Sequence, residues 1–157
     1  MSTAVCLVRP AAEADVPQVV EAVEELLAEL RAGSAGPLPP SSAEVCRALV
    51  RQGLVLVASD PRAPGEIVGL VAATVQETIH LGGPYGLIQE LWVAPSHRSG
   101  GLGAELVDEL RRRLAARGID TVEVGLPRRS FGSFERTHRF YEQCGFDEIG
   151  PRMRVCA

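Results

Sequence analysis

The sequence predicts an α/β fold, in which helices cover both faces of one mixed β-sheet. Segments of strand-like composition alternate with amphipathic segments in the order β-α-α-β-β-β-α-β-α-β. Several of the strand candidates are apolar on both faces, as expected for strands inside a covered sheet. The 157 residues, 46% of them hydrophobic and 23% charged, match one ordinary globular unit, so we expect a single domain over residues 1–157.

The first part of the chain is expected to hold a strand, a helix and a loop. Residues 5–9 form the strand candidate. Asp15 is typical of a helix N-cap, and Gln18 occupies the capping-box position at the start of an apolar stripe with helical spacing. The segment 32–40, which reads AGSAGPLPP, is a loop by composition.

The remaining elements follow from similar patterns. A second helix is expected from Ser41, with Glu44 in capping-box position, and Gly53 is expected just beyond its end. A helix over 101–117 places its acidic residues before its basic ones, which suits the helix dipole. The other candidates are the strands 54–58, 67–75, 87–93 and 121–126, the helix 133–143 and a final edge strand over 153–155.

Composition excludes several classes of protein. A formal net charge of -4 gives no support for binding nucleic acid or an anionic membrane. No signal peptide is recognisable, and the apolar run 67–75 is too short to span a bilayer. We therefore expect a cytoplasmic protein. Its cysteines should be reduced, in neither a disulfide framework nor a zinc site, because they are scattered over Cys6, Cys46, Cys144 and Cys156.

The most informative segment is a glycine-rich turn between a buried strand and a helix. Gly100, Gly101 and Gly103 let the backbone bend sharply, and the first amides of the helix are free to bind a phosphate or pyrophosphate. A P-loop would need a lysine after the glycines, and a dinucleotide fold would place its turn near the first strand. A plain loop that needs glycine to turn is the simpler alternative.

In its context this turn, Arg98-x-x-Gly101-x-Gly103, resembles the acyl-CoA signature of the GCN5-related N-acetyltransferase (GNAT) family. Val8-Arg9-Pro10-Ala11, Val93-x-Pro95 and Phe140-Tyr141-x-x-x-Gly145-Phe146 are similar to other motifs of that family, in the same order. The resemblance implies a sheet of about six to seven strands with about four helices, and acetyl-CoA or another acyl-CoA as co-substrate. It implies no metal. The residues that it implies for cofactor binding are Leu91, Trp92, Val93, Arg98, Ser99, Gly100, Gly101, Leu102, Gly103 and Ala104.

The resemblance also implies an acid and a base for acyl transfer to an amine. Glu90 is the candidate base, because burial in an apolar strand raises the pKa of a carboxyl group; a structural carboxylate is the alternative. In some relatives the base lies one position earlier, where this chain has Gln89, which cannot accept a proton. Tyr141 is the candidate acid, with a core aromatic as the alternative. His80, Tyr85 and His138 are weaker candidates for the base.

One departure from the family pattern concerns the cofactor arm. Relatives often carry an asparagine seven residues before the tyrosine, where this chain has Phe134; Ser133 is the candidate replacement. The acceptor is expected to be a small-molecule amine, with a protein or peptide amine as the alternative, and the chain to be a monomer or homodimer. The acceptor loops are expected at 32–40, 77–85 and 127–132. A catalytically silent acyl-CoA-binding module and an unrelated nucleotide-binding domain are the competing hypotheses.

Overall fold

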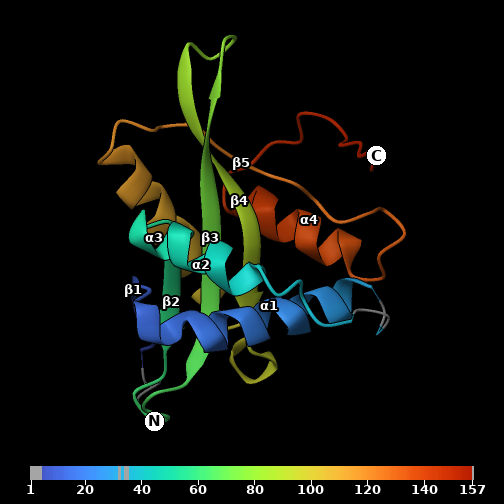
Figure 1. The fold of residues 1–157 in the computed structure, drawn as a ribbon. Coiled ribbons are helices and arrows are strands. Elements are labelled where there is room, and N and C mark those ends of the chain that lie inside the picture. Colours follow the sequence, from blue (N-terminus) through green and yellow to red (C-terminus); the bar gives the residue numbers. More distant parts are fainter. Residues whose placement is uncertain (1–4, 32, 34–35, 157) are drawn as a thin grey trace.

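One five-stranded sheet forms the centre of the computed structural model, which describes residues 5–31, 33 and 36–156 (Figure 1). The strands lie side by side in chain order. Neighbouring strands are antiparallel except for the last pair, which is parallel, so the predicted mixed sheet is confirmed. The strands are β1 (Leu7–Pro10), β2 (Val55–Ser59), β3 (Ile67–Thr78), β4 (Gly83–Val93) and β5 (Val122–Val124).

Within the described residues, four helices cover the two faces of this sheet. They are α1 (Val16–Leu30), α2 (Ser42–Arg51), α3 (Leu102–Ala115) and α4 (Phe134–Gln143), with short 3-10 turns η1 (Glu13–Asp15) and η2 (Pro95–His97). β2 shows how the two cores form: Leu56 packs on the α3 side, and the next residue, Val57, packs on the α1 and α2 side. The predicted loop over 32–40 and the amino-terminal residues lie partly outside the described ranges.

The predicted capping boxes do not form. Asp15 precedes α1 but makes no capping bond to it, because its carboxylate pairs with Arg9 at 2.7 Å and accepts the Ala12 amide at 2.7 Å. Gln18 instead bonds across to the turn between β2 and β3. Ser41 precedes α2 without a side-chain bond to it. The Arg9 guanidinium therefore takes the Asp15 carboxylate, and the backbone of Gly65 and Ile67 takes the Gln18 side chain, away from the predicted cap.

The predicted edge strand over 153–155 is not formed, so the sheet has five strands instead of the expected six to seven. Pro151 has no N–H to donate to a neighbouring strand, and Gly150 turns the backbone with a φ of 146°. The described residues 147–156 therefore run past β5 without joining it.

Candidate active site

The glycine-rich turn between β4 and α3 presents a row of backbone N–H groups. β4 ends at Val93, η2 follows, and α3 begins at Leu102. The first bond of the helix runs from the Glu105 amide to the Gly101 carbonyl at 3.0 Å. Within the part of the chain that the structure describes, the amides of residues 99–104 therefore have no backbone partner. Such amides, with the helix dipole behind them, attract anions.

The turn is held in place by its own backbone angles and by Arg98. Gly101 caps α3 with a φ of 88°, and Ser99 has a φ of 64°, both in the left-handed region. The Arg98 guanidinium donates to the Val93 carbonyl at 2.9 Å and to Glu29 of α1 at 2.6 Å. The Arg98 side chain thus anchors the turn to β4 and to α1.

A cleft of about 720 Å³ lies beside this turn, where β4 and β5 separate. The two strands pair only between 86–88 and 122–124; beyond that point β4 continues while β5 ends. Gly100 is not part of the cleft lining. The other residues predicted to bind the cofactor do line it: Leu91, Trp92, Val93, Arg98, Ser99, Gly101, Leu102, Gly103, Ala104 and Ser133.

Tyr141 lines the same cleft from α4. Its ring is buried and packs edge-on against Phe140, with ring centroids 5.0 Å apart, and against Phe146, at 5.4 Å. Burial, and to a smaller extent Cys144, raises the pKa of Tyr141 well above its ordinary value. The phenol therefore stays protonated at neutral pH and is able to donate a proton to a leaving group.

A β-bulge in β4 separates the two positions considered for a base. Glu90 pairs with Ala72 of β3, whereas Gln89 falls at the shift in register and has no partner in the ladder. Gln89 lines the cleft and donates to the Thr74 hydroxyl at 3.0 Å. Glu90 is outside the cleft lining and acts electrostatically on Cys46 of α2. Burial raises its pKa, but the predicted acid and base do not meet in this cleft.

The first residues of α4 face two different cavities. Ser133 is exposed and lines the cleft. Phe134 is buried and lines the second cavity instead, where its ring lies 5.2 Å from the Arg129 guanidinium and 5.8 Å from the His138 ring. At this end of the cleft, Ser133 and not Phe134 offers a polar side chain.

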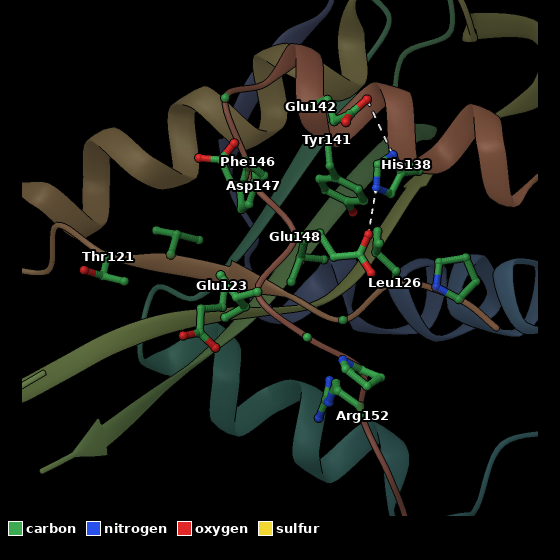
Figure 2. A pocket seen from close by; sticks show the side chains of 18 of the residues that line it. Thr121, Glu123, Leu126, His138, Tyr141, Glu142, Phe146, Asp147, Glu148 and Arg152 are labelled. Atoms are coloured by element: carbon green, nitrogen blue, oxygen red, sulfur yellow. Dashed lines mark hydrogen bonds and ion pairs between the residues drawn. The ribbon is translucent and has the colours of Figure 1, made fainter. Parts of the chain in front are cut away.

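The second cavity, of about 1080 Å³, lies at β5 and is bounded by α4 and the segment 147–152 (Figure 2). His138 lies between Glu142, at 3.5 Å, and Glu148, at 3.2 Å. Glu148 also pairs with Arg129 at 2.7 Å. His138 is therefore held by carboxylates, and Tyr141 lies in the wall that both cavities share.

Sequence patterns did not indicate two contributions to the cleft. Leu26 and Leu30, at the end of α1, line it because the helix crosses behind β4, which only the tertiary structure shows. The sequence did not show the position of the Trp92 side chain. Its indole N–H is buried, and no described residue accepts a hydrogen bond from it.

The part of the chain that forms this site matches a known protein family. The model of the acetyltransferase (GNAT) family matches residues 21–146. No curated protein sequence matches the chain significantly. Among the described residues, no helix has both the length and the apolar character needed to cross a membrane.

Many solved structures have the same fold. An acetyltransferase from Trypanosoma brucei is 25% identical, with a TM-score of 0.69 over 97% of this chain and 99% of that one. An aminoglycoside acetyltransferase from an uncultured soil metagenomic sample is 20% identical (TM-score 0.74; 97% and 96% covered). A predicted acetyltransferase from Clostridium acetobutylicum, solved with acetyl-CoA, is 15% identical (TM-score 0.73; 97% and 96% covered). The two lower identities establish the fold alone.

Proposed function

The chain belongs to the GNAT family of acetyltransferases, and from this premise we propose that it transfers an acetyl group from acetyl-CoA to a primary amine. One observation carries the proposal: the unpaired amides of residues 99–104 border the cleft that the Tyr141 phenol lines. Amides of this kind suit a pyrophosphate, and a neutral phenol suits a thiolate leaving group. Acetyl-CoA contains a pyrophosphate, and its thioester releases a thiolate when the acetyl group is transferred.

In this proposal the co-substrate lies along the edge of β4 that β5 leaves free. The pyrophosphate binds the amides of 99–104, and the backbone of Leu91–Val93 pairs with the amide-containing arm as a strand would. The Ser133 hydroxyl is one of the polar side chains available at the far wall. Acetyl-CoA supplies the activated acetyl group.

The chain's own residues handle the protons of the reaction. We assign removal of the amine proton to Glu90, acting through a water molecule held at Gln89, because Glu90 itself does not line the cleft. Its raised pKa makes Glu90 a stronger base than an exposed carboxylate. The amine nitrogen then bonds to the acetyl carbon by direct attack, the carbon–sulfur bond breaks, and Tyr141 gives its proton to the sulfur.

A small-molecule amine is the proposed acceptor, with a protein or peptide amine as the alternative. A cleft of about 720 Å³ must hold the acetyl-bearing arm and the acceptor together, which favours a small acceptor. The aminoglycoside acetyltransferase of similar fold is in keeping with this class. We place the reaction in the cytoplasm, with the chain acting as a monomer or homodimer.

A catalytically silent acyl-CoA-binding module is the second candidate, and the position of Glu90 outside the cleft favours it. Calorimetric titration with acetyl-CoA and CoA, with ATP and NAD as controls, tests the shared cofactor class. Release of CoA in the presence of a panel of small amines then separates the two functions. Binding of both CoA species with amine-dependent release supports the transferase, binding without release supports the silent module, and no binding overturns both.

A further inference from the structure

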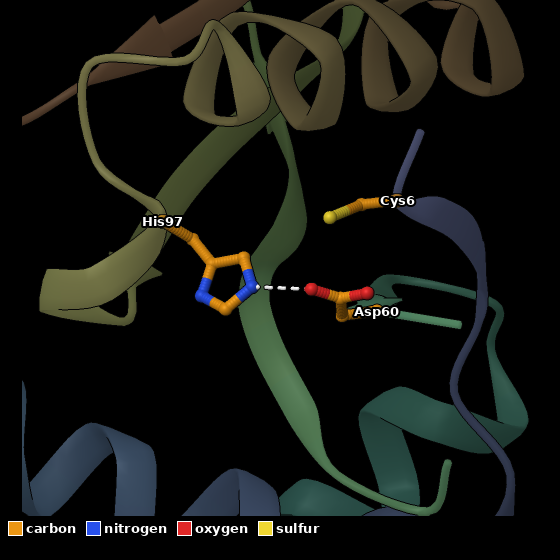
Figure 3. Close-up of side chains that lie close together, drawn as sticks. All are labelled: Cys6, Asp60 and His97. Atoms are coloured by element: carbon orange, nitrogen blue, oxygen red, sulfur yellow. Dashed lines mark hydrogen bonds and ion pairs between the residues drawn. The ribbon is translucent and has the colours of Figure 1, made fainter. Parts of the chain in front are cut away.

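Three metal-binding side chains from distant parts of the sequence meet at one end of the sheet (Figure 3). Cys6 precedes β1, Asp60 follows β2, and His97 ends η2. One ligand atom from each, the cysteine sulfur, a carboxylate oxygen and a ring nitrogen, lies within 4.8 Å of the other two. This cluster, called here the Cys-Asp-His cluster, has no assigned part in the transfer chemistry, although His97 also lines the cleft.

The sheet itself brings these residues together. Leu7 pairs with Ser59, so the preceding Cys6 and the following Asp60 extend the same antiparallel register. The Ala94 amide donates to the Val68 carbonyl at 2.9 Å, which holds the start of η2 against the neighbouring strand. Backbone pairing thus fixes the positions from which the three side chains converge.

Asp60 is already held like the ligand of a cation. Its carboxylate is 3% exposed, and it accepts the Arg62 amide at 2.8 Å and the Arg62 guanidinium at 2.7 Å. The Arg62 side chain is itself 65% exposed, so solvent is able to take over its hydrogen bonds. The arginine therefore occupies the place of a positive charge that another cation is able to take over.

His97 is oriented from both sides. Its Nδ1 lies 2.8 Å from the Ser96 hydroxyl, and its Nε2 lies 2.9 Å from an Asp60 oxygen. The Nε2–H group donates to the carboxylate when Nδ1 accepts from the Ser96 hydroxyl. If the ring proton moves to Nδ1, with the Ser96 oxygen as its acceptor, the Nε2 lone pair becomes available to a metal ion. A hydroxyl partner on the second ring nitrogen is the arrangement that orients a metal-binding histidine.

We propose that the Cys-Asp-His cluster binds a zinc ion through the Cys6 sulfur, an Asp60 oxygen and His97 Nε2, with water as fourth ligand. This mixture of sulfur, nitrogen and oxygen ligands is typical of zinc. In a tetrahedral zinc site such atoms lie about 3.3–3.6 Å apart, so the longest separation in the cluster would shorten by up to about 1.5 Å, while the 2.9 Å pair of His97 and Asp60 would open by about 0.5 Å. Binding releases the thiol proton to solvent, leaves the ring proton of His97 on Nδ1, and displaces the Arg62 guanidinium.

The zinc ion would join three segments next to the anion-binding turn. His97 immediately precedes Arg98, and the acidic side chains of Asp60 and Glu105 both act on Cys6. A cation there is attracted by these acids, and it ties the chain before β1 to the turn after β2 and to η2. We assign the ion a structural role, which does not depend on acetyl transfer.

The test uses Co²⁺, a spectroscopic substitute for Zn²⁺, titrated into the full chain. Wild type is expected to bind one ion, with the absorption band of a cobalt–thiolate bond, and Zn²⁺ is expected to displace it. Cys6→Ser should lose this band and at least about tenfold in affinity. Cys156→Ser, at an exposed cysteine, is the matched control and should keep both. A band that survives Cys6→Ser, or is lost in Cys156→Ser, overturns the proposal.

Arg62→Gln provides a second test, in which the affinity for Co²⁺ should rise instead of fall. Removing the guanidinium that competes for Asp60 should tighten Co²⁺ binding, because the carboxylate is then left without its cation. Zinc should also raise the melting temperature of wild type and of Arg62→Gln, but not that of Cys6→Ser. Unchanged or weaker binding in Arg62→Gln would contradict a site centred on Asp60.

Discussion

Phe140 of α4 lies so close to Gly103 of α3 that a β-carbon at position 103 would stand 3.2 Å from two ring atoms. Gly103→Ala should therefore destabilise the protein by about 1 kcal/mol, because the cost of overpacking exceeds the gain in helix propensity. Urea unfolding measures the change. In a Phe140→Leu background the same substitution should cost nothing, and equal costs in both backgrounds would contradict this contact as the cause.

Gly101→Val should abolish acetyl-CoA binding. Valine at a φ of 88° distorts the turn, and its side chain would enter the open space in front of the amides. Calorimetry measures the loss. Gly118→Val is the matched control, because Gly118 has a similar φ of 77° in open space but lies at the other end of α3. If the control loses binding as well, backbone strain and not access to the amides explains the effect.

Tyr141→Phe should lower kcat by about 100-fold while leaving the affinity for acetyl-CoA unchanged. The phenol supplies a proton that phenylalanine lacks, and the ring contacts with Phe140 and Phe146 are kept. Because burial raises the pKa of Tyr141, wild-type activity should show no loss from its ionisation up to about pH 10. Steady-state kinetics across pH, beside calorimetry of the variant, decides the matter; an unaltered kcat would remove the acid role.

Glu90→Gln should remove the acid limb of the rate profile. In wild type, activity falls as the pH drops through the raised pKa of Glu90, because the protonated base cannot accept a proton from the amine. The variant should be slower and insensitive to pH in that range. A variant that keeps the acid limb would show that another group is the base.

The same substitution has a stability effect of predictable sign. Folding raises the pKa of the Glu90 carboxyl, so this group binds more protons in the native state than in the unfolded state. Its contribution to the free energy of unfolding therefore falls as the pH rises from the ordinary pKa of a glutamate to the raised pKa of Glu90. The Glu90→Gln variant should not show this fall, and at neutral pH its free energy of unfolding should be higher than that of wild type. Urea unfolding at two pH values measures it, with the exposed Glu25→Gln as control.

Much of the fold could be predicted because local patterns and tertiary contacts agree. The apolar stripe of α3 is buried against the sheet, and Gly53 and Gly118 end their helices with positive φ angles, as their positions indicate. The glycine-rich turn was recognisable because a sharp bend between a strand and a helix favours glycine at a left-handed position, which Gly101 occupies.

The remaining features depend on partners far away in the sequence. The bulge at Gln89 exists only in the register between β4 and β3, so no pattern within β4 could show that Gln89, and not Glu90, lines the cleft. Asp15 has the spacing of a helix cap, but Arg9 competes for its carboxylate. Cys6 seemed isolated because its neighbours, Asp60 and His97, lie in separate segments of the chain.

The short last strand has a consequence for concentrated solutions. β5 is three residues long, and Asp147, Glu148 and Arg152 line the cavity at β5, with Arg152 against Gly125 (Figure 2). A sheet edge this short, lined by charges of both signs, offers few backbone groups to a strand of another molecule. The edge formed by β5 is therefore a poor template for growth into amyloid-like fibrils, even though the described residues add no sixth strand to cover it.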